Sequence, residues 1–179
     1  TVIDIVQVDA SAPRSIITAI EENRMAEIEA IAKKADDSAR LKYDELHFEV
    51  PIANPGKILC LGLNYMDHVA EGPFNKPDFP AIFMRTATSM VAHGQPILRP
   101  LQSETMDYEA ELALIIGKRS RHLTADNALS AIAGYSCFND GSVREYQRHT
   151  IQWTMGKNFD QTGPFGPVMV TPDELPDGA

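Results

Sequence analysis

The sequence contains only two cysteines, Cys60 and Cys137, and neither belongs to a CxxC motif or to a Cys/His spacing of the zinc-binding kind. A chain that forms disulfides or structural zinc sites normally carries more cysteines, in pairs or clusters. Both cysteines lie in short apolar runs. The cysteine content therefore argues against zinc and favours a reducing, intracellular compartment.

Positive charge is also scarce, because 16 Lys and Arg residues face 25 Asp and Glu residues and leave a net charge of −9. Nucleic acids and anionic membrane surfaces require clustered basic residues, so we expect neither to be the main partner. A small anion can still be bound by a few basic residues or by a metal ion. No apolar run approaches the roughly 20 residues that span a bilayer, and no basic-then-apolar leader opens the chain. We expect a soluble, cytoplasmic protein.

The length and composition are those of a globular protein with about one domain, since 44% of its 179 residues are hydrophobic and 23% are charged. Pro55 and Gly56 mark a predicted boundary between a small N-terminal segment, 1–54, and a main domain, 55–179. The first segment opens with an alternating run, VIDIVQV, which favours a strand. Isoleucines at helical spacing then predict one amphipathic helix from about Pro13 to Ala35.

The main domain reads as rich in strands. The runs KILCLGL, AIFMR, ELALIIGK and GYSCFND have strand length and are separated by Pro, Gly and Asn. Two short helices are predicted in TADNALSAIA, with Thr124 as its cap, and in SVREYQRHT. Strands and helices do not alternate regularly, so the pattern predicts an α+β fold with a mixed, β-rich sheet and peripheral helices.

The stretch DYEAELALIIG places three acids on one face of a predicted strand. Asp107, Glu109 and Glu111 share that face with Ala113 and Ile115, which are core residues by type. One interpretation is a solvated strand end, and another is a helix, because Glu, Ala and Leu are good helix formers.

If these acids are buried, a divalent cation would relieve the repulsion between the carboxylates. Glu109 and Glu111 are the candidate ligands, and Asp140 in YSCFNDGS is a third, although a turn or cap role is an alternative for it. Hard oxygen ligands indicate Mg²⁺, Mn²⁺ or Ca²⁺.

The segment GLNYMDHVAEGP supplies a candidate general base. His68 and Glu71 are three residues apart after the strand KILCLGL, so one helical turn would place them on the same side. The carboxylate could then orient the imidazole and raise its basicity, so that the imidazole could act as a general base on water. The alternative is a pair of solvated surface residues.

Basic and amide side chains near the later motifs are candidates for binding a substrate carboxylate or an oxyanion. They are Arg85, Arg144, Gln147 and Lys157. Taken one at a time, each of them is most often a surface residue.

Four ordered motifs, GLNYMDHVAE, DYEAELALIIGK, GYSCFNDGSVREYQ and QWTMGKNFDQTGPFGP, resemble the fumarylacetoacetate hydrolase family over roughly Lys57 to Leu175. The resemblance implies the sandwich or roll of that family's C-terminal domain, and often a homodimer. The family's domain continues further, so we expect the visible chain to lack the C-terminal half of the fold.

The resemblance also implies roles for individual residues. It assigns metal binding to Glu109, Glu111 and Asp140, water activation to His68 and Glu71, the oxyanion to Lys157, and substrate oxygens to Arg144 and Gln147. Arg85 is a further candidate for binding substrate. Family members often have Lys followed by Pro where this chain has Arg85 and Thr86, so we expect a different substrate contact there.

These roles suit hydrolysis of a carbon–carbon bond in a 2,4-dioxo acid such as an acylpyruvate, with Mg²⁺ stabilising the enolate. The same site suits decarboxylation, isomerisation or hydration of 2-oxo acids, including oxaloacetate and hydroxymuconate-type substrates. A non-catalytic metal-binding or assembly module is the third hypothesis.

Overall fold

The computed structural model describes residues 1–65 and 77–175. The strands are β1 (Val2–Ile3), β2 (Arg40–Leu41), β3 (Ile58–Gly62), β4 (Ala81–Arg85), β5 (Met90–Ala92), β6 (Met106–Asp107), β7 (Ala110–Ile116), β8 (Ile132–Asn139), β9 (Ser142–Val143) and β10 (Gly163–Phe165). The α-helices are α1 (Ile5–Val8), α2 (Ile16–Glu21), α3 (Met25–Ala32), α5 (Arg144–Arg148) and α6 (Thr154–Lys157). Short 3-10 turns are η1 (Asp37–Ala39), η2 (Tyr43–Glu45), η3 (Ala87–Ser89) and η4 (Ala128–Ala131).

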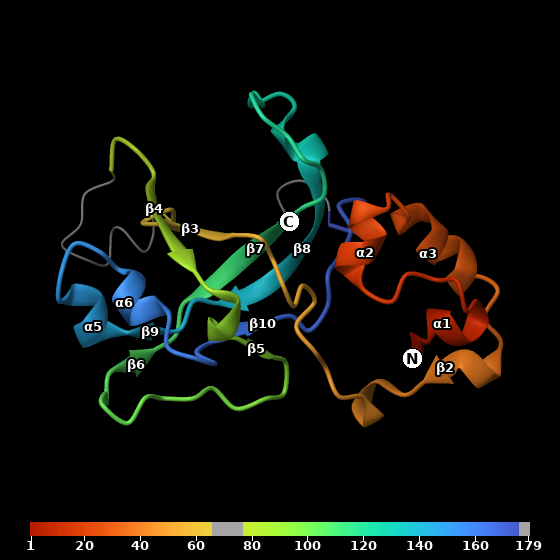
Figure 1. Cartoon of the computed structure of the whole chain (residues 1–179), viewed down its shortest axis with the longest axis horizontal. Helices are drawn as coiled ribbons and strands as arrows, with labels where there is room; N and C mark the ends of the chain where they lie inside the picture. The colour runs from red at the N-terminus through yellow and green to blue at the C-terminus, as the bar shows by residue number, and fades with distance from the viewer. Residues whose placement is uncertain (66–76, 176–179) are drawn as a thin grey trace.

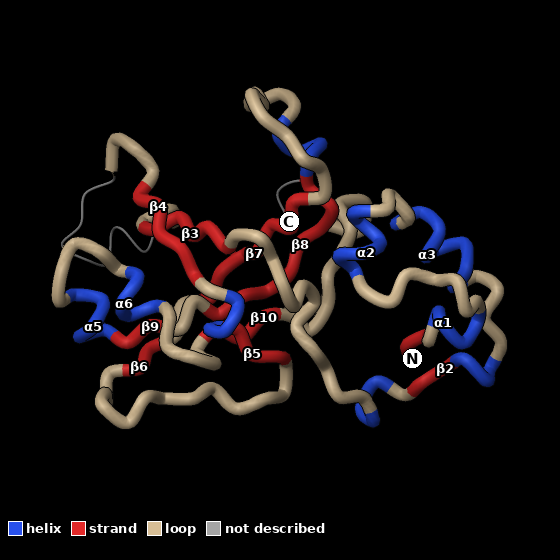
Figure 2. The backbone as a smooth tube through the Cα atoms, in the orientation of Figure 1, coloured by secondary structure: helices blue, strands red, loops and turns tan. Residues whose placement is uncertain are grey.

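The central element is a mixed four-stranded sheet in the order β5-β10-β8-β7. β10 runs parallel to β5 and antiparallel to β8, and β7 runs antiparallel to β8. The pairs β3-β4, β6-β9 and β1-β2 form three smaller antiparallel sheets. Helices α1–α3 gather at one end of the molecule, together with β1 and β2, and α5 and α6 lie at the other end, with the central sheet between them (Figures 1 and 2). The mixed α+β fold with peripheral helices, as predicted for the family's C-terminal domain, is confirmed.

The four runs predicted as strands in the main domain form β3, β4, β7 and β8, and the helix predicted in SVREYQRHT is α5. Those predictions are confirmed. The helix predicted in TADNALSAIA is wrong, because only the 3-10 turn η4 forms there. The stretch DYEAELALIIG is also not one continuous strand, since β6 ends at Asp107 and β7 begins at Ala110.

The N-terminal segment departs most from the prediction. The expected helix from Pro13 to Ala35 is two helices, because the chain turns at Asn23, whose φ of 55° lies in the left-handed region that Asn tolerates. The expected strand VIDIVQV is likewise divided. Asp4 caps a helical turn by accepting hydrogen bonds from the backbone N–H groups of Val6 and Gln7, which ends β1 after two residues.

The hydrophobic core lies between the central sheet and α2. Ile52, Met90, Ile115 and Phe165 form its buried centre, and the partly buried Ile16, Ile17 and Ile20 of α2 pack against it. Burial of these apolar side chains is the main contribution to stability that can be identified in the fold. The core thus contains side chains from both sides of Pro55, and the division of the chain there stays a prediction.

One face of several strands lies in solvent. Leu112, Leu114 and Ile116 on β7 are 50%, 50% and 62% exposed, while Ile115 between them is buried. On the β3-β4 pair, Leu59 lies opposite Met84 and Leu61 opposite Ile82, and all four are largely exposed. The acid-bearing face of β7 is therefore the inner one, as its pattern predicted. Among the described helices, none has the length and apolar character needed to cross a membrane.

The turn between β8 and β9 approaches the segment before β10 so closely that only glycine fits. A Cβ on Gly141 would lie 2.1 Å from the carbonyl oxygen of Thr162. We expect Gly141→Ala in the full-length protein to lower the free energy of unfolding by ~1–3 kcal/mol, since the backbone must move. Urea denaturation measures this change.

Gly56→Ala is the matched control, because a Cβ on Gly56 meets nothing within 4 Å. We expect its free energy of unfolding to stay within about 0.5 kcal/mol of the parent. Equal stability of the two variants would contradict the close approach at Gly141.

Candidate active site

The predicted acids meet where β7 begins and β8 ends. Because these strands are antiparallel and Ala110 pairs with Asn139, the residue before β7, Glu109, lies beside the residue after β8, Asp140. The Asp140 backbone N–H donates to the Glu109 carbonyl at 2.8 Å. The Glu109 N–H donates in turn to Asn139 Oδ1 at 3.0 Å. Sheet register alone therefore brings together two acids that are 31 positions apart in the sequence.

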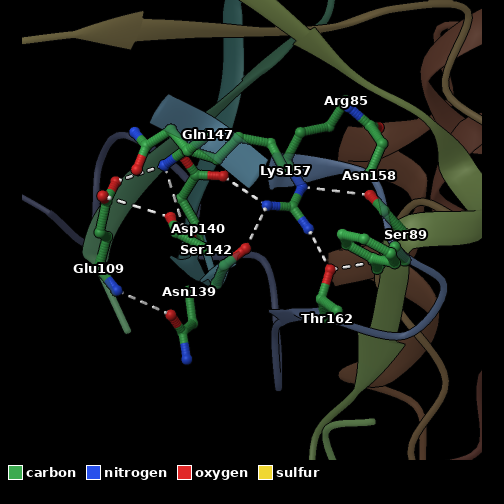
Figure 3. A network of polar contacts seen from close by, with 12 residues as sticks. Arg85, Ser89, Glu109, Asn139, Asp140, Ser142, Gln147, Lys157, Asn158 and Thr162 are labelled. Carbon is green, nitrogen blue, oxygen red and sulfur yellow. Dashed lines mark hydrogen bonds and ion pairs between the residues drawn. The ribbon is translucent and has the colours of Figure 1, made fainter. Parts of the chain in front are cut away.

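Lys157 joins these two carboxylates. Its Nζ donates to Glu109 Oε2 and to Asp140 Oδ2, each at 2.7 Å (Figure 3). Only 1% of the Lys157 side chain is exposed, and its ammonium lies 5.2 Å from the centre of the Phe83 ring. Gly156 allows α6 to pack directly on α5, since a Cβ on Gly156 would lie 2.5 Å from the backbone nitrogen of Gln147. A buried ammonium is stable in such a place only when carboxylates surround it.

Arg85 binds the other oxygen of Asp140. Its Nη1 lies 2.5 Å from Asp140 Oδ1, and none of the Arg85 side chain is exposed. Arg85 is the last residue of β4, so this ion pair links the β3-β4 pair to the end of β8. Asp140, which is 4% exposed, thus has one cation at each oxygen.

Arg144 lies at the rim of the same cluster. It starts α5 and contacts Glu109 Oε1 at 2.5 Å and Asp107 Oδ2 at 2.8 Å. It also donates to Gln147 Oε1 at 2.9 Å. Its side chain is 19% exposed, in contrast to the fully enclosed Arg85. Asp107, which had no partner predicted from the sequence, therefore has one in Arg144.

The charges change the acid strengths of the two glutamates in opposite directions. Burial by itself would raise the pKa of Glu109, but Lys157 and Arg144 outweigh it, so the pKa lies below its ordinary value. Burial raises the pKa of Glu111, and the negative charges of Glu109 and Asp140 raise it further, against a hydrogen bond from Tyr65. Among the described residues, Glu111 has no ion-pair partner.

The structure brings together most of the side chains that the sequence singled out. A single connected network contains Arg85, Glu109, Asp140, Arg144, Gln147 and Lys157. Glu111 is close enough to the two other acids to be influenced by their charge. His68 and Glu71 lie outside the described residues, and their role stays a prediction.

Several partners in the network had no signal in the sequence. Ser89 and Thr162 accept hydrogen bonds from Arg85, and the Ser142 hydroxyl lies 3.3 Å from Glu109 Oε1. Hydroxyl residues are common in loops, so type and position do not distinguish these from others. Only the folded chain shows what they bind.

Comparisons with known proteins show which sequences and structures the chain is similar to. A sequence model of the family described as fumarylacetoacetate (FAA) hydrolase C-terminal matches residues 57–179. The mitochondrial oxaloacetate tautomerase FAHD2A of Homo sapiens is 34% identical over 178 residues, which is 98% of this chain and 57% of that protein. The chain thus spans a little over half the length of this curated relative.

Two solved structures are similar in both sequence and fold. The fumarylacetoacetate hydrolase of Exiguobacterium antarcticum is 34% identical with a TM-score of 0.61, covering 77% of this chain and 53% of that one. The 5-carboxymethyl-2-hydroxymuconate delta-isomerase of Mycobacterium smegmatis is 34% identical with a TM-score of 0.61, covering 69% and 49%. The similar proteins therefore include a tautomerase, a hydrolase and an isomerase.

Members of this family generally use divalent metal ions, and the donor set here suits one. Glu109 and Asp140 converge on a single cationic point, the Lys157 ammonium, and their oxygens are the hard donors that Mg²⁺, Mn²⁺ and Ca²⁺ prefer. Within residues 1–65 and 77–175, no three His, Cys, Asp or Glu side chains are grouped as an ion-binding cluster. The three-ligand set of Glu109, Glu111 and Asp140 stays a prediction.

Cys60 on β3 lies close enough to the site for the charge of Asp140 to affect the pKa of its thiol. Burial raises the pKa of the Cys60 thiol to about 12, and the negative charge of Asp140 adds to the increase. At pH 8 the thiolate fraction is then on the order of 10⁻⁴, far below that of an ordinary thiol. We therefore expect a disulfide reagent at pH 8 to modify the exposed Cys137 well before Cys60.

Mass spectrometry of the labelled peptides measures this order, and labelling in urea, where both thiols are exposed, is the control. Raising the pH toward 10 is expected to increase the Cys60 rate steadily, because its thiolate fraction keeps rising. Equal rates for the two cysteines in the folded protein at pH 8 would contradict the burial of Cys60.

Proposed function

The chain belongs to the fumarylacetoacetate hydrolase family, and from this we propose that its protein is a metal-dependent enzyme that enolises small 2-oxo acids. The proposed reaction moves a proton between the carbon next to the carbonyl and the carbonyl oxygen, as in the tautomerisation of oxaloacetate. The observation that carries the proposal is the convergence of Glu109 and Asp140 on one buried point, next to Glu111. The tautomerase and isomerase among the similar proteins support it.

The metal ion would be held by Glu109, Glu111 and Asp140, with Mg²⁺, Mn²⁺ or Ca²⁺ as candidates. When bound, such an ion polarises the 2-oxo carbonyl and lowers the free energy of the enolate. The charges of the site support a divalent ion, because carboxylates outnumber basic side chains. The acids are Asp107, Glu109, Glu111 and Asp140, and the basic residues are Arg85, Arg144 and Lys157. An anionic substrate would add further negative charge.

Substrate recognition is assigned to the rim of the site. Arg144 is partly exposed, so its positive charge can attract a substrate carboxylate, which would share the guanidinium with Asp107 and Glu109. Gln147 accepts a hydrogen bond from Arg144 and so limits its orientation. The Lys157 ammonium fixes Glu109 and Asp140, and its assignment to a substrate oxyanion rests on the sequence resemblance.

Proton transfer is assigned to His68, oriented by Glu71. This part of the proposal depends on the sequence spacing alone, since both residues lie outside the described ranges. An imidazole has an ordinary pKa of about 6.5, which suits removal of the acidic proton of a 2-oxo acid near neutral pH.

Hydrolysis of a carbon–carbon bond in an acylpyruvate is the second candidate. The match to the fumarylacetoacetate hydrolase favours it. Here His68 would deprotonate water, which attacks the distal carbonyl, and the pyruvate fragment leaves as its enolate. Both candidates require the same stabilised enolate, so the products decide between them. The predicted homodimer and cytoplasmic location belong to this proposal as well.

Glu111→Gln in the full-length protein tests the metal site. The amide keeps the shape but removes the negative charge, so we expect turnover of oxaloacetate to fall by at least ~10²-fold and Mn²⁺ to bind more weakly. Chelation of the parent with EDTA should abolish turnover, and added Mg²⁺ or Mn²⁺ should restore it. The enol absorbance, pyruvate release and acylpyruvate cleavage are measured in parallel to identify the reaction.

Glu104→Gln is the control, because Glu104 is exposed in the loop before β6 and takes no part in the network. It should retain the parent rate. Turnover that persists in EDTA, or a Glu111→Gln variant as active as the parent, would refute the proposed metal chemistry.

A further inference from the structure

Arg85 is enclosed by hydrogen-bond acceptors. Its Nε donates to the Ser89 hydroxyl at 3.1 Å, Nη1 donates to Asp140 Oδ1 at 2.5 Å and to the Gly141 carbonyl at 3.1 Å, and Nη2 donates to the Thr162 hydroxyl at 2.9 Å (Figure 3). These bonds use four of the five N–H groups of the guanidinium. With no exposed surface either, Arg85 is in no position to bind a substrate carboxylate.

The two hydroxyl partners are themselves fixed. Ser89 Oγ donates to the Thr86 carbonyl at 2.8 Å, and Thr162 Oγ1 donates to the Phe159 carbonyl at 2.8 Å. A hydroxyl has one hydrogen, so each can meet Arg85 only as an acceptor. The Phe138 ring covers the guanidinium at 5.5 Å. The surroundings are therefore matched to a planar group with several donors, which an ammonium would not satisfy.

The contact with Arg85 restricts the orientation of the Asp140 carboxylate. Its Oδ1 is held by Arg85, and its backbone N–H by the Glu109 carbonyl. With one oxygen and the main chain fixed, the second oxygen, Oδ2, is directed to the point that Asp140 shares with Glu109 and Lys157. Without the Arg85 contact, the carboxylate would keep only the Lys157 contact at Oδ2 and its orientation would be less restricted.

We propose that Arg85 is a positioning residue that orients the Asp140 carboxylate for metal binding, and that it does not contact the substrate. This inference rests on the proposed function, in which Asp140 is a metal ligand. It replaces the substrate contact that the sequence suggested for Arg85. It also gives a physical reason for an arginine at this position, because four acceptors from three segments have to be satisfied at once.

Arg85→Lys in the full-length protein is the test. The variant keeps the charge but loses the fork of donors, so we expect Mn²⁺ to bind about 10- to 100-fold more weakly, as for other partners of metal ligands. Titration of free Mn²⁺ by electron paramagnetic resonance measures this affinity without any turnover. With Mn²⁺ saturating, we expect the KM for oxaloacetate to stay within about twofold of the parent and the lost kcat to return in part.

Arg24→Lys is the matched control. Arg24 also forms ion pairs, with Glu22 and Glu27, but it lies between α2 and α3 and outside the network. Its Mn²⁺ affinity should equal that of the parent. Ser89→Ala removes one acceptor without changing charge and should weaken Mn²⁺ binding by a smaller factor. If Arg85→Lys does not fold, the Ser89→Ala result decides.

Other outcomes refute the inference. A raised KM with unchanged Mn²⁺ affinity would show that Arg85 contacts substrate. A lower melting temperature with unchanged Mn²⁺ affinity would show a purely structural role. If the parent binds Mn²⁺ but converts no 2-oxo acid, the proposed reaction fails while the Arg85 comparison still stands. A parent that binds no divalent ion would refute both.

Discussion

The interaction on which the rest of the site depends is the contact of the Lys157 ammonium with Glu109 and Asp140. Three ionised groups meet there in a largely buried place, and the enclosed Lys157 ammonium is tolerated because it contacts both carboxylates. The arrangement requires β7, β8 and α6 to meet within a hydrogen-bond length. A displacement of α6 would separate the Lys157 ammonium from both of its carboxylate partners, whereas Glu109 would keep Arg144 and Asp140 would keep Arg85. The electrostatic requirement therefore limits where these elements can lie.

The strands of the main domain and their buried faces could be predicted from the sequence. The strands of the main domain follow from short apolar runs between turn residues, and the inward face of β7 follows from the order of Glu111, Ala113 and Ile115. The helices of the N-terminal segment could not be predicted correctly, since the left-handed backbone of Asn23 interrupts a continuous pattern of isoleucines. Periodicity shows which face of a segment is apolar, but it does not show where the backbone turns.

The candidate site was predicted as a set of residues but not as a set of contacts. Sequence motifs identified Glu109, Asp140 and Lys157, which the fold joins directly. The partners of Arg85 could not be predicted, because they are 4, 55, 56 and 77 positions away. Such contacts arise from strand register and loop path, which one sequence does not specify. The same limit applied to Asp107, whose partner Arg144 is 37 positions away.

The packing of α2 on the sheet couples the unfolding of this helix to that of the strands beneath it. Ile16, Ile17 and Ile20 share one core with Ile115 and Phe165, which lie in the two strands that flank β8. Opening α2 would expose apolar surface of β7 and β10, and Glu109 directly precedes β7. We therefore expect α2 and the strand next to Glu109 to unfold together, so that loss of the helix would loosen the carboxylates of the candidate site.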